Sequence, residues 1–216
     1  MTTSTESPSP GAEARLIERI RQGERELFHD LIRPYERSVY LAAYSVLRNE
    51  ADAEDVAQEA ILKAMTHVGE LRADSKFKVW LLSITYNEAR MRRRKDHKHL
   101  YESVDEPDEG GEEGEFMPRQ FADWREIPSE ALERKEVREA VARALEKLPE
   151  RHREIFLLRD VQHLDVAETA AALGISAPAV KTRLHRARLQ MREELAPFFK
   201  KGWRDRIPFG KGKKPW

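Results

Sequence analysis

The chain contains no cysteine among its 216 residues, which excludes a disulfide framework, a thiolate zinc site and a cysteine nucleophile. It also lacks any apolar run approaching the roughly 18 residues that would span a bilayer. Residues 1–11 are rich in Ser, Thr and Pro and have no apolar core, so they do not resemble a signal peptide. These absences predict a cytoplasmic protein without membrane insertion.

The formal net charge is zero, because 39 Lys and Arg residues balance 39 Asp and Glu residues. The charges are nevertheless segregated, since residues 98–128 hold 10 acids against 3 bases, interspersed with Gly and Pro. Such a segment buries too little apolar surface to offset the entropy of ordering it, so we expect a flexible acidic linker.

Helical periodicity of apolar residues fills the segments on either side of this linker, residues 12–97 and 129–196. Strand alternation and hairpin turn signals are weak throughout. The sequence therefore predicts an all-α fold of two small helical domains joined by the linker. Residues 1–11 are expected to be disordered, and residues 197–216 form a basic, aromatic tail to which the sequence assigns no role.

Local signals place several helix boundaries in the first segment. Pro34 predicts a kink or a new helix start. Asn49 is expected to close one helix, and Asp52 to cap the N-terminus of the next. Asp74 or Ser75 can cap the helix that follows.

The segment 165–192 has the pattern of a helix-turn-helix. Asp165 and Glu168 form the pair of a capping box, and Gly174 stands where the turn requires a positive φ. From Ile175 to Arg192 there are bases but no acids. A helix that enters the major groove needs such residues for base edges and phosphates; the candidates are Lys181, Thr182, Arg183, His185, Arg186 and Arg188. A Gly-linked helix pair with a merely solvated basic face is the alternative, and we favour DNA binding.

A second candidate nucleic-acid surface lies in residues 71–95, where the sequence combines aromatic and basic side chains. Phe77, Trp80 and Tyr86 could stack on bases beside a cationic groove. Trp80 taken alone is more often a core residue, and the basic run from Arg90 to Lys95 could simply complement a helix dipole.

An acidic strip precedes this surface and consists of Asp52, Glu54, Asp55, Gln58 and Glu59. Acids in the first turns of a helix cap it and complement its dipole. Exposed in a row, they also offer a surface to a basic partner helix.

Taken together, these stretches resemble a known family. The runs RNEADAEDVAQEAILKA and LRADSKFKVWLLSITYNEARMRRRK, followed after a linker by LEKLPERHREIFLLRDVQHLDVAETAAALGISAPAVKTRLHRARLQMREEL, are similar to the extracytoplasmic-function (ECF, group 4) sigma factors of the sigma-70 superfamily. The resemblance covers roughly residues 12–97 and 129–196, and implies a sigma-2 bundle and a sigma-4 helix-turn-helix domain.

The resemblance implies a role for each segment. The acidic strip would dock on the coiled-coil clamp of the largest RNA polymerase subunit, and the sigma-4 domain on the flap of the second-largest subunit. The set predicted to recognise and melt the −10 element is Leu71, Arg72, Asp74, Ser75, Lys76, Phe77, Trp80, Asn87, Arg90, Arg92, Arg93 and Arg94. The −35 element would be read by Lys181, Thr182, His185 and Arg186, with Arg183 and Arg188 nearer the backbone.

The implied partners are core RNA polymerase, promoter DNA and an anti-sigma factor. No catalytic residues, metal ligands or cofactors are expected, because no nucleophile triad, carboxylate pair or phosphate-binding Gly loop is present and the His residues lack ligand spacing. Two departures from the family are Thr169, at a usually apolar site, and Ala73, where Gly is common. Two other functions remain open: a helix-turn-helix regulator that binds DNA alone as a dimer, and a protein that sequesters an acidic partner.

Overall fold

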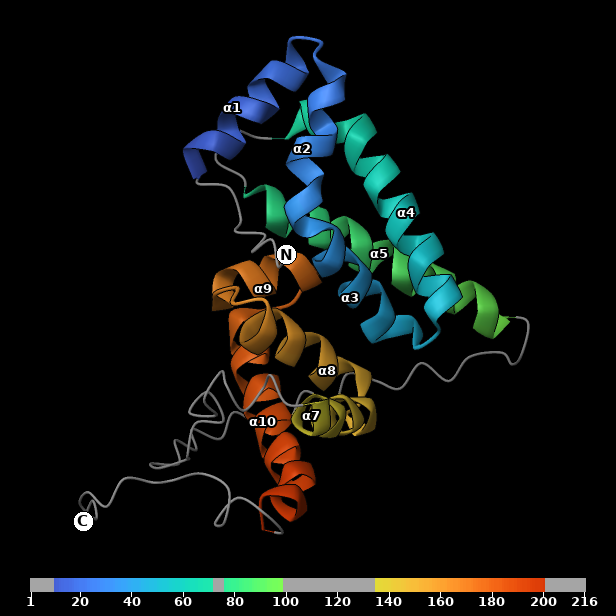
Figure 1. Ribbon diagram of the computed structural model, residues 1–216, viewed down its shortest axis with the longest axis vertical. Coiled ribbons are helices and arrows are strands. Elements are labelled where there is room, and N and C mark those ends of the chain that lie inside the picture. Colours follow the sequence, from blue (N-terminus) through green and yellow to red (C-terminus); the bar gives the residue numbers. More distant parts are fainter. Residues whose placement is uncertain (1–9, 72–75, 99–134, 201–216) are drawn as a thin grey trace, which may run out of the picture. The chain divides into compact units, whose positions relative to one another are not determined.

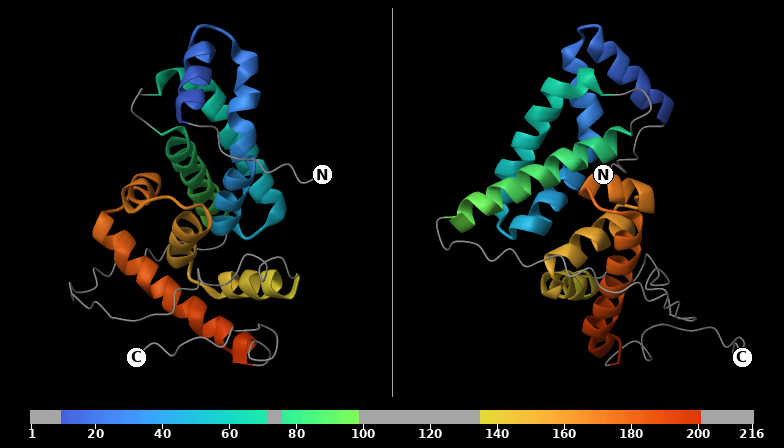
Figure 2. Two further views of the ribbon diagram at one scale, coloured as in Figure 1. Left: turned by 60° about the vertical axis from the view of Figure 1, so that its left-hand side comes forward. Right: turned by 180° about the vertical axis from the view of Figure 1, so that it is seen from behind.

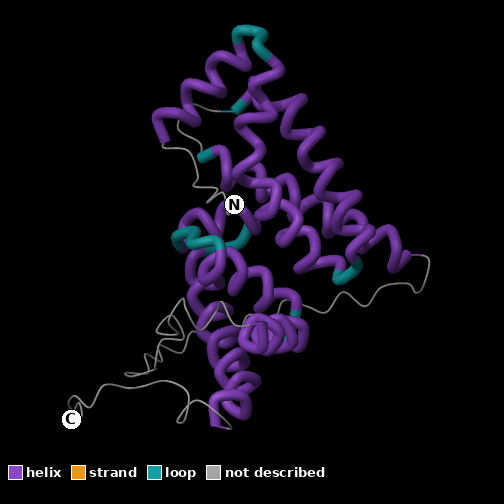
Figure 3. Tube along the Cα trace, in the orientation of Figure 1, coloured by secondary structure: helices purple, strands orange, loops and turns teal. Residues whose placement is uncertain are grey.

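The computed structural model describes residues 10–71, 76–98 and 135–200, and all regular structure in these ranges is helical (Figures 1 and 3). This confirms the predicted all-α class. None of the described helices is long and apolar enough to cross a membrane. The expected N-terminal disorder, the linker from residue 99 onward, the cap at Asp74 or Ser75 and the tail from residue 201 lie outside the described residues.

The chain divides into two compact units. The first unit comprises residues 1–104 and 150–184, and the second comprises residues 105–149 and 185–216. The first unit contains α1 (Pro10–Arg21), η1 (Arg25–Leu27), α2 (Phe28–Ile32), η2 (Arg33–Tyr35), α3 (Glu36–Leu47), α4 (Glu50–His67), η3 (Val68–Glu70), α5 (Phe77–Lys98), α8 (Glu150–Phe156), the π-helix η5 (Leu157–Val161) and α9 (Val166–Leu173). The second contains α7 (Lys135–Lys147), and α10 (Ala177–Lys200) begins in the first unit and ends in the second.

The predicted boundary signals act only in part as expected, because α3 ends at Leu47 with Arg48 as its C-cap and is not closed by Asn49. Pro34 lies within η2, so a new helix start follows it. The prediction for α4 was wrong by one turn: Asn49, not Asp52, is the N-cap, and its side-chain oxygen accepts a hydrogen bond from the Asp52 amide at 3.1 Å. Asn49 has extended backbone angles that suit a cap, because Arg48 before it already ends α3 in the left-handed region at φ 56°. Asp52 consequently lies in the first turn of α4.

The first unit has two apolar clusters. One lies between α1, α2, the first half of α3, α4 and the first turns of α5, with Leu31, Val39, Phe77 and Leu81 fully buried. The other is built from α3, α4 and α5 together with residues 155–184.

The second cluster explains why residues 150–184 belong to the first unit. Ile155 and Leu158 are buried beside Leu82 and Tyr86 of α5, so residues 150–184 have no separate core of their own. Figures 1 and 2 show α9 beside the first half of α5. In the second unit, Lys147 at the end of α7 pairs with Glu194 of α10 at 2.6 Å.

Candidate nucleic-acid interface

Helix α5 carries most of the residues predicted to contact the −10 element, and its packing decides which of them reach the surface. Phe77 and Tyr86 are fully buried, and the Phe77 ring lies 5.6 Å from Tyr35 and 5.8 Å from Trp80 between centroids. The interpretation of Phe77 and Tyr86 as base-stacking surfaces is therefore wrong for this conformation, because both rings form core. Trp80 is half-buried, and Leu71 is buried.

Three cations on the polar side of α5 and one at the residue before it form what we call the cationic face: Lys76, Lys78, Arg90 and Arg93. Each of them contacts residues 150–173. Lys76 pairs with Glu168 at 2.6 Å, and the ammonium of Lys78 donates to the Gln162 carbonyl at 2.8 Å. The pairing with Glu168 raises the pKa of Lys76, whereas burial lowers that of Lys78.

Arg90 bonds to two of the residues in the segment 150–173. Its guanidinium donates to the Leu173 carbonyl at 3.2 Å and to the Glu154 carboxylate at 3.0 Å, and it lies 5.7 Å from the Tyr86 ring centroid. The Glu154 side chain is only 5 % exposed. Burial raises the pKa of Glu154, and the charge of Arg90 opposes that shift. Arg93 pairs with Glu150 in the same region.

A buried arginine of α8 connects that helix to α3. Arg153 is 7 % exposed, and its guanidinium donates to the Ser45 carbonyl of α3 at 2.6 Å. A buried guanidinium without a partner would be costly, so this bond strongly orients α8.

The remaining predicted residues of α5 are arranged differently. Arg92 contacts Asp52 at 2.9 Å and Asp55 at 3.6 Å, so a predicted DNA residue lies against the acidic strip. Asn87 and Arg94 are exposed. Arg72, Asp74 and Ser75 lie outside the described residues.

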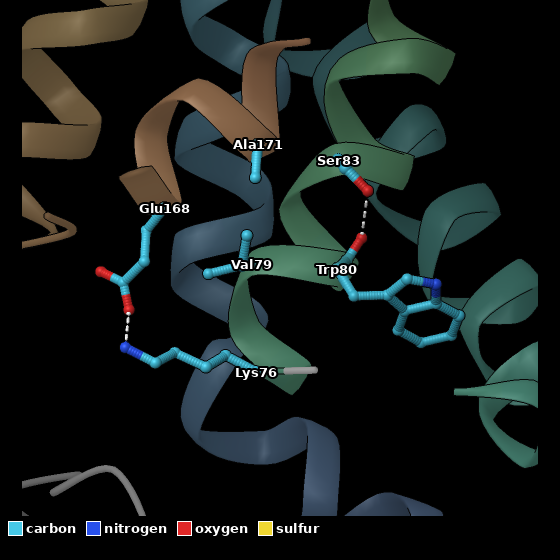
Figure 4. Close-up of a pocket in the computed structure, with 6 residues that line it drawn as sticks. All are labelled: Lys76, Val79, Trp80, Ser83, Glu168 and Ala171. Atoms are coloured by element: carbon cyan, nitrogen blue, oxygen red, sulfur yellow. Dashed lines mark hydrogen bonds and ion pairs between the residues drawn. The ribbon is translucent and has the colours of Figure 1, made fainter. Parts of the chain in front are cut away.

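An open pocket of about 370 Å³ lies beside the contact of α5 with α9 (Figure 4). It is lined by Lys76, Val79, Trp80, Ser83, Glu168 and Ala171. The Lys76–Glu168 pair closes one end, Val79 and Ala171 point into the gap, and the Ser83 hydroxyl donates to the Trp80 carbonyl at 2.7 Å. Within residues 10–71, 76–98 and 135–200, no three His, Asp or Glu side chains are grouped so that they could hold a metal ion.

The acidic strip lies along the outer side of α4. Glu54, Asp55, Gln58 and Glu59 are exposed, whereas Asp52 is half-buried beside Arg92. The strip continues into two residues that the sequence analysis missed.

Those two residues are Leu62 and Met65, which are 57 % and 47 % exposed. Leu62 lies three residues after Glu59 and Met65 lies seven residues after Gln58, so both are on the continuation of the same helix face. This signal was present in the sequence. The outer side of α4 therefore changes from acidic to apolar along its length.

The helix-turn-helix pattern forms as its local signals predicted. Asp165 caps α9 and accepts the Glu168 amide at 2.8 Å, while the Glu168 side chain accepts the Asp165 amide, which completes the capping box. Gly174 ends α9 at φ 67°. The Ser176 hydroxyl accepts the Ala179 amide at 3.3 Å at the start of α10. Thr169 is fully buried, and its hydroxyl donates to the Asp165 carbonyl at 2.8 Å, so the polar group costs little.

All six residues predicted to read the −35 element lie on α10. Lys181, Thr182 and Arg186 are exposed, and Arg183, His185 and Arg188 are half-buried. The helix thus offers two bases and a hydroxyl directly to solvent.

Comparison with known proteins identifies both parts of the chain. Residues 31–99 match the Sigma-70 region 2 family model, and residues 138–191 match the model for Sigma-70, region 4. The ECF RNA polymerase sigma factor SigW of Bacillus subtilis (strain 168) is 30% identical over 181 residues, which cover 83% of this chain and 94% of SigW. The chain therefore belongs to the ECF sigma factors of the sigma-70 family.

Two solved structures share the fold. CnrH in complex with the cytosolic domain of CnrY has a TM-score of 0.58 and 24% identity, covering 86% of this chain and 98% of that one. The sigma factor RpoE in complex with the anti-sigma factor NepR from Bartonella quintana also has a TM-score of 0.58, with 22% identity and coverage of 78% and 96%. At these identities the likeness concerns the fold alone.

Proposed function

We propose that this protein binds core RNA polymerase and directs it to promoters by recognising −10 and −35 elements and assisting DNA melting. The observation that carries the proposal is the presence, on one short chain, of a region 2 bundle with an exposed acidic strip and a capped region 4 helix-turn-helix with exposed bases. Either part alone would support only a nucleic-acid or protein-binding role. The proposed role is binding and positioning, with catalysis left to the polymerase.

The functional domains are proposed as residues 12–97 and 129–196, with residues 98–128 as the connection. The acidic strip would dock on the largest-subunit clamp, where exposed carboxylates complement a basic helix. Leu62 and Met65, which continue the strip, would be buried against the same polymerase subunit. Large exposed apolar side chains on one helix face are typical of interfaces.

DNA contacts divide between α5 and α10. Lys76, Arg90, Arg93 and Arg94 would hold phosphates of the −10 region, and Asn87 would contact an unstacked base near them. Lys181, Thr182 and Arg186, exposed on α10, would enter the major groove of the −35 element. Two small modules, each weak alone, gain affinity when polymerase holds them at a fixed spacing.

An anti-sigma factor is proposed as a further partner. Its support is that the RpoE relative of the same fold was solved in complex with an anti-sigma factor. A protein that covers the acidic strip or the DNA-binding residues would block initiation.

In vitro transcription with core polymerase across a promoter library tests the proposal. A sigma factor yields promoter-specific transcripts and binds promoter DNA poorly without core enzyme. A dimeric helix-turn-helix regulator would instead bind duplex DNA tightly alone, and a sequestering protein would give a stable protein complex without transcripts. Absence of any promoter-specific transcript would overturn the proposal.

The −35 assignment has its own test in Arg186→Ala. If Arg186 makes a bidentate base contact, the variant should lose about 1–3 kcal/mol of −35 affinity and relax specificity at one base pair. Arg192→Ala is the matched control, because Arg192 is exposed on the same helix and is not placed in the reading set.

A further inference from the structure

Helix α1 contacts the segment that leads into the predicted −10 set. The helix precedes residue 31, where the match to the Sigma-70 region 2 model begins. Arg21, its last residue, donates from Nε to the Gly69 carbonyl at 3.1 Å and from a terminal nitrogen to the Leu71 carbonyl. These bonds join residues 48 and 50 positions apart, so they depend on how α1 packs and not on local sequence.

The arrangement of the two carbonyls suits a guanidinium. Residues 68–70 form η3, and the chain leaves this helix at Leu71, which is extended at φ −62° and ψ 127°. Carbonyls at the end of a helix lack partners within it, and a planar guanidinium can donate to two of them at once in fixed directions. The remaining nitrogen of Arg21 lies 3.5 Å from the Glu18 carboxylate on α1. Each nitrogen of the guanidinium therefore has a partner, which fixes its orientation.

Apolar packing supports these bonds. Ile17 and Ile20 of α1 are buried in the same cluster as Val68, Leu71 and Phe77. Phe77 is the first residue of α5. One cluster therefore joins α1 to the residue before and the residue after the predicted −10 stretch 72–76.

A second polar contact connects α1 to the far end of the same stretch. The Tyr35 hydroxyl donates to the Glu13 carboxylate, in the first turn of α1, at 2.6 Å. The Tyr35 ring in turn lies 5.6 Å from the Phe77 ring between centroids. Helix α1 is thus connected to Leu71 directly, through Arg21, and to Phe77 through Tyr35.

We propose that Arg21 is a positioning residue for −10 recognition, which fixes the backbone of residues 69–71 relative to α5. The inference rests on the proposed function and adds a residue that lies outside both the family match and the predicted DNA-binding set. Arg21 acts through the residues that it holds. A set of contact residues that is held loosely has to be ordered when DNA binds, and this lowers the affinity by the fraction of molecules that are competent to bind.

The experiment compares two substitutions of Arg21 with the same substitutions of Arg19. Arg21→Lys keeps the charge but loses the fork that donates to two carbonyls, and Arg21→Met keeps an aliphatic chain without any donor. Arg19 lies on the same helix and pairs with Glu24, so Arg19→Lys and Arg19→Met are the matched controls. Each full-length variant is assembled with core polymerase. Its affinity is then measured for a fork DNA that has a single-stranded −10 element and no −35 element.

We expect Arg21→Met to bind the fork DNA about tenfold more weakly than wild type, as follows when about one-tenth of the molecules remain competent. Arg21→Lys should lose less, and both Arg19 variants should bind like wild type. Fork DNAs with an abasic site at each −10 position in turn provide a second measurement. An abasic site at the recognised base weakens binding by wild type, and this penalty should shrink in the Arg21 variants because they hold that base less well. A general loss of stability would leave the penalty unchanged.

Two results would overturn the inference. One is that the Arg21 variants bind the fork DNA as tightly as the Arg19 variants do. The other is weaker binding with the abasic penalty of wild type, because Arg21 would then support only the fold. If urea unfolding shows that Arg21→Met does not fold, Arg21→Lys decides by the same two measurements.

The outcomes separate this inference from the proposed function. Promoter-specific transcription by the wild-type chain upholds the sigma function whatever the Arg21 variants do. Wild-type chain that binds no −10 fork DNA together with core polymerase would count against the function itself.

Discussion

Phe77 offers the sharpest test of how α5 is built, because the sequence pattern and the structure assign it different roles. Its side chain is fully buried against Tyr35 and Trp80. Truncation of a buried Phe to Ala costs about 3–5 kcal/mol, from lost burial and the cavity left behind. Against a total free energy of unfolding of roughly 5–15 kcal/mol, this loss is severe. For a chain of this size it corresponds to a melting temperature lower by about 6–20 °C.

The assay combines denaturation with DNA binding. Phe77→Ala and Phe77→Leu are compared by urea unfolding and by affinity for a −10 single-stranded probe. Leu retains much of the buried volume but has no ring, so we expect it to recover most of the stability and, with it, DNA binding. If Phe77→Leu were stable yet bound the probe as poorly as a base-stacking mutant, or if Phe77→Ala unfolded like wild type, the assignment of Phe77 to the core would be refuted.

Three further predictions concern the turn of the helix-turn-helix, its buried threonine and the buried glutamate. Gly174→Ala should destabilise the protein by about 1–2 kcal/mol, because Gly174 has φ 67°, and Gly174→Asn should cost less; equal melting temperatures of the two variants would contradict this. Thr169→Val should change the free energy of unfolding by less than about 1 kcal/mol, because the Asp165 carbonyl still accepts the backbone amide of residue 169 at 3.0 Å; a larger loss in urea unfolding would show that the hydroxyl is required. Burial raises the pKa of Glu154 above its ordinary value of 4.5, so the contribution of this group to stability is present at low pH and is lost as the pH rises through its folded-state pKa. Glu154→Gln should therefore flatten the pH dependence of the free energy of unfolding above about pH 4.5, whereas Glu193→Gln should leave the wild-type profile; identical profiles would contradict the raised pKa.

Local signals were enough to predict much of this protein. Helical periodicity and the absence of strand patterns gave the all-α class. The capping box at Asp165 and Glu168 and the positive φ at Gly174 were predictable because each depends on a few neighbouring residues. The resemblance in both segments identified the family, since two motifs in the expected order are far more specific than one.

Register at a helix start was harder to predict. Asn49 and Asp52 are both good cap residues three positions apart, and the left-handed turn at Arg48 decided in favour of Asn49. The neighbouring sequence likewise does not decide whether Leu62 and Met65 are exposed. An apolar residue on a helix is buried or exposed according to what packs on that face.

Only the tertiary structure decided how the residues predicted for DNA are used in the free chain. A basic, aromatic helix has the same sequence pattern whether its rings face a core or a base, and packing against Tyr35 placed Phe77 inside. The pairing of Arg90 with Glu154 joins residues 64 positions apart, and such a contact depends on how two helical segments pack rather than on either local pattern. The sequence by itself determined the helices, the capping box of α9, the charge segregation and the family; long-range packing determined which aromatics are core and which cations are already paired.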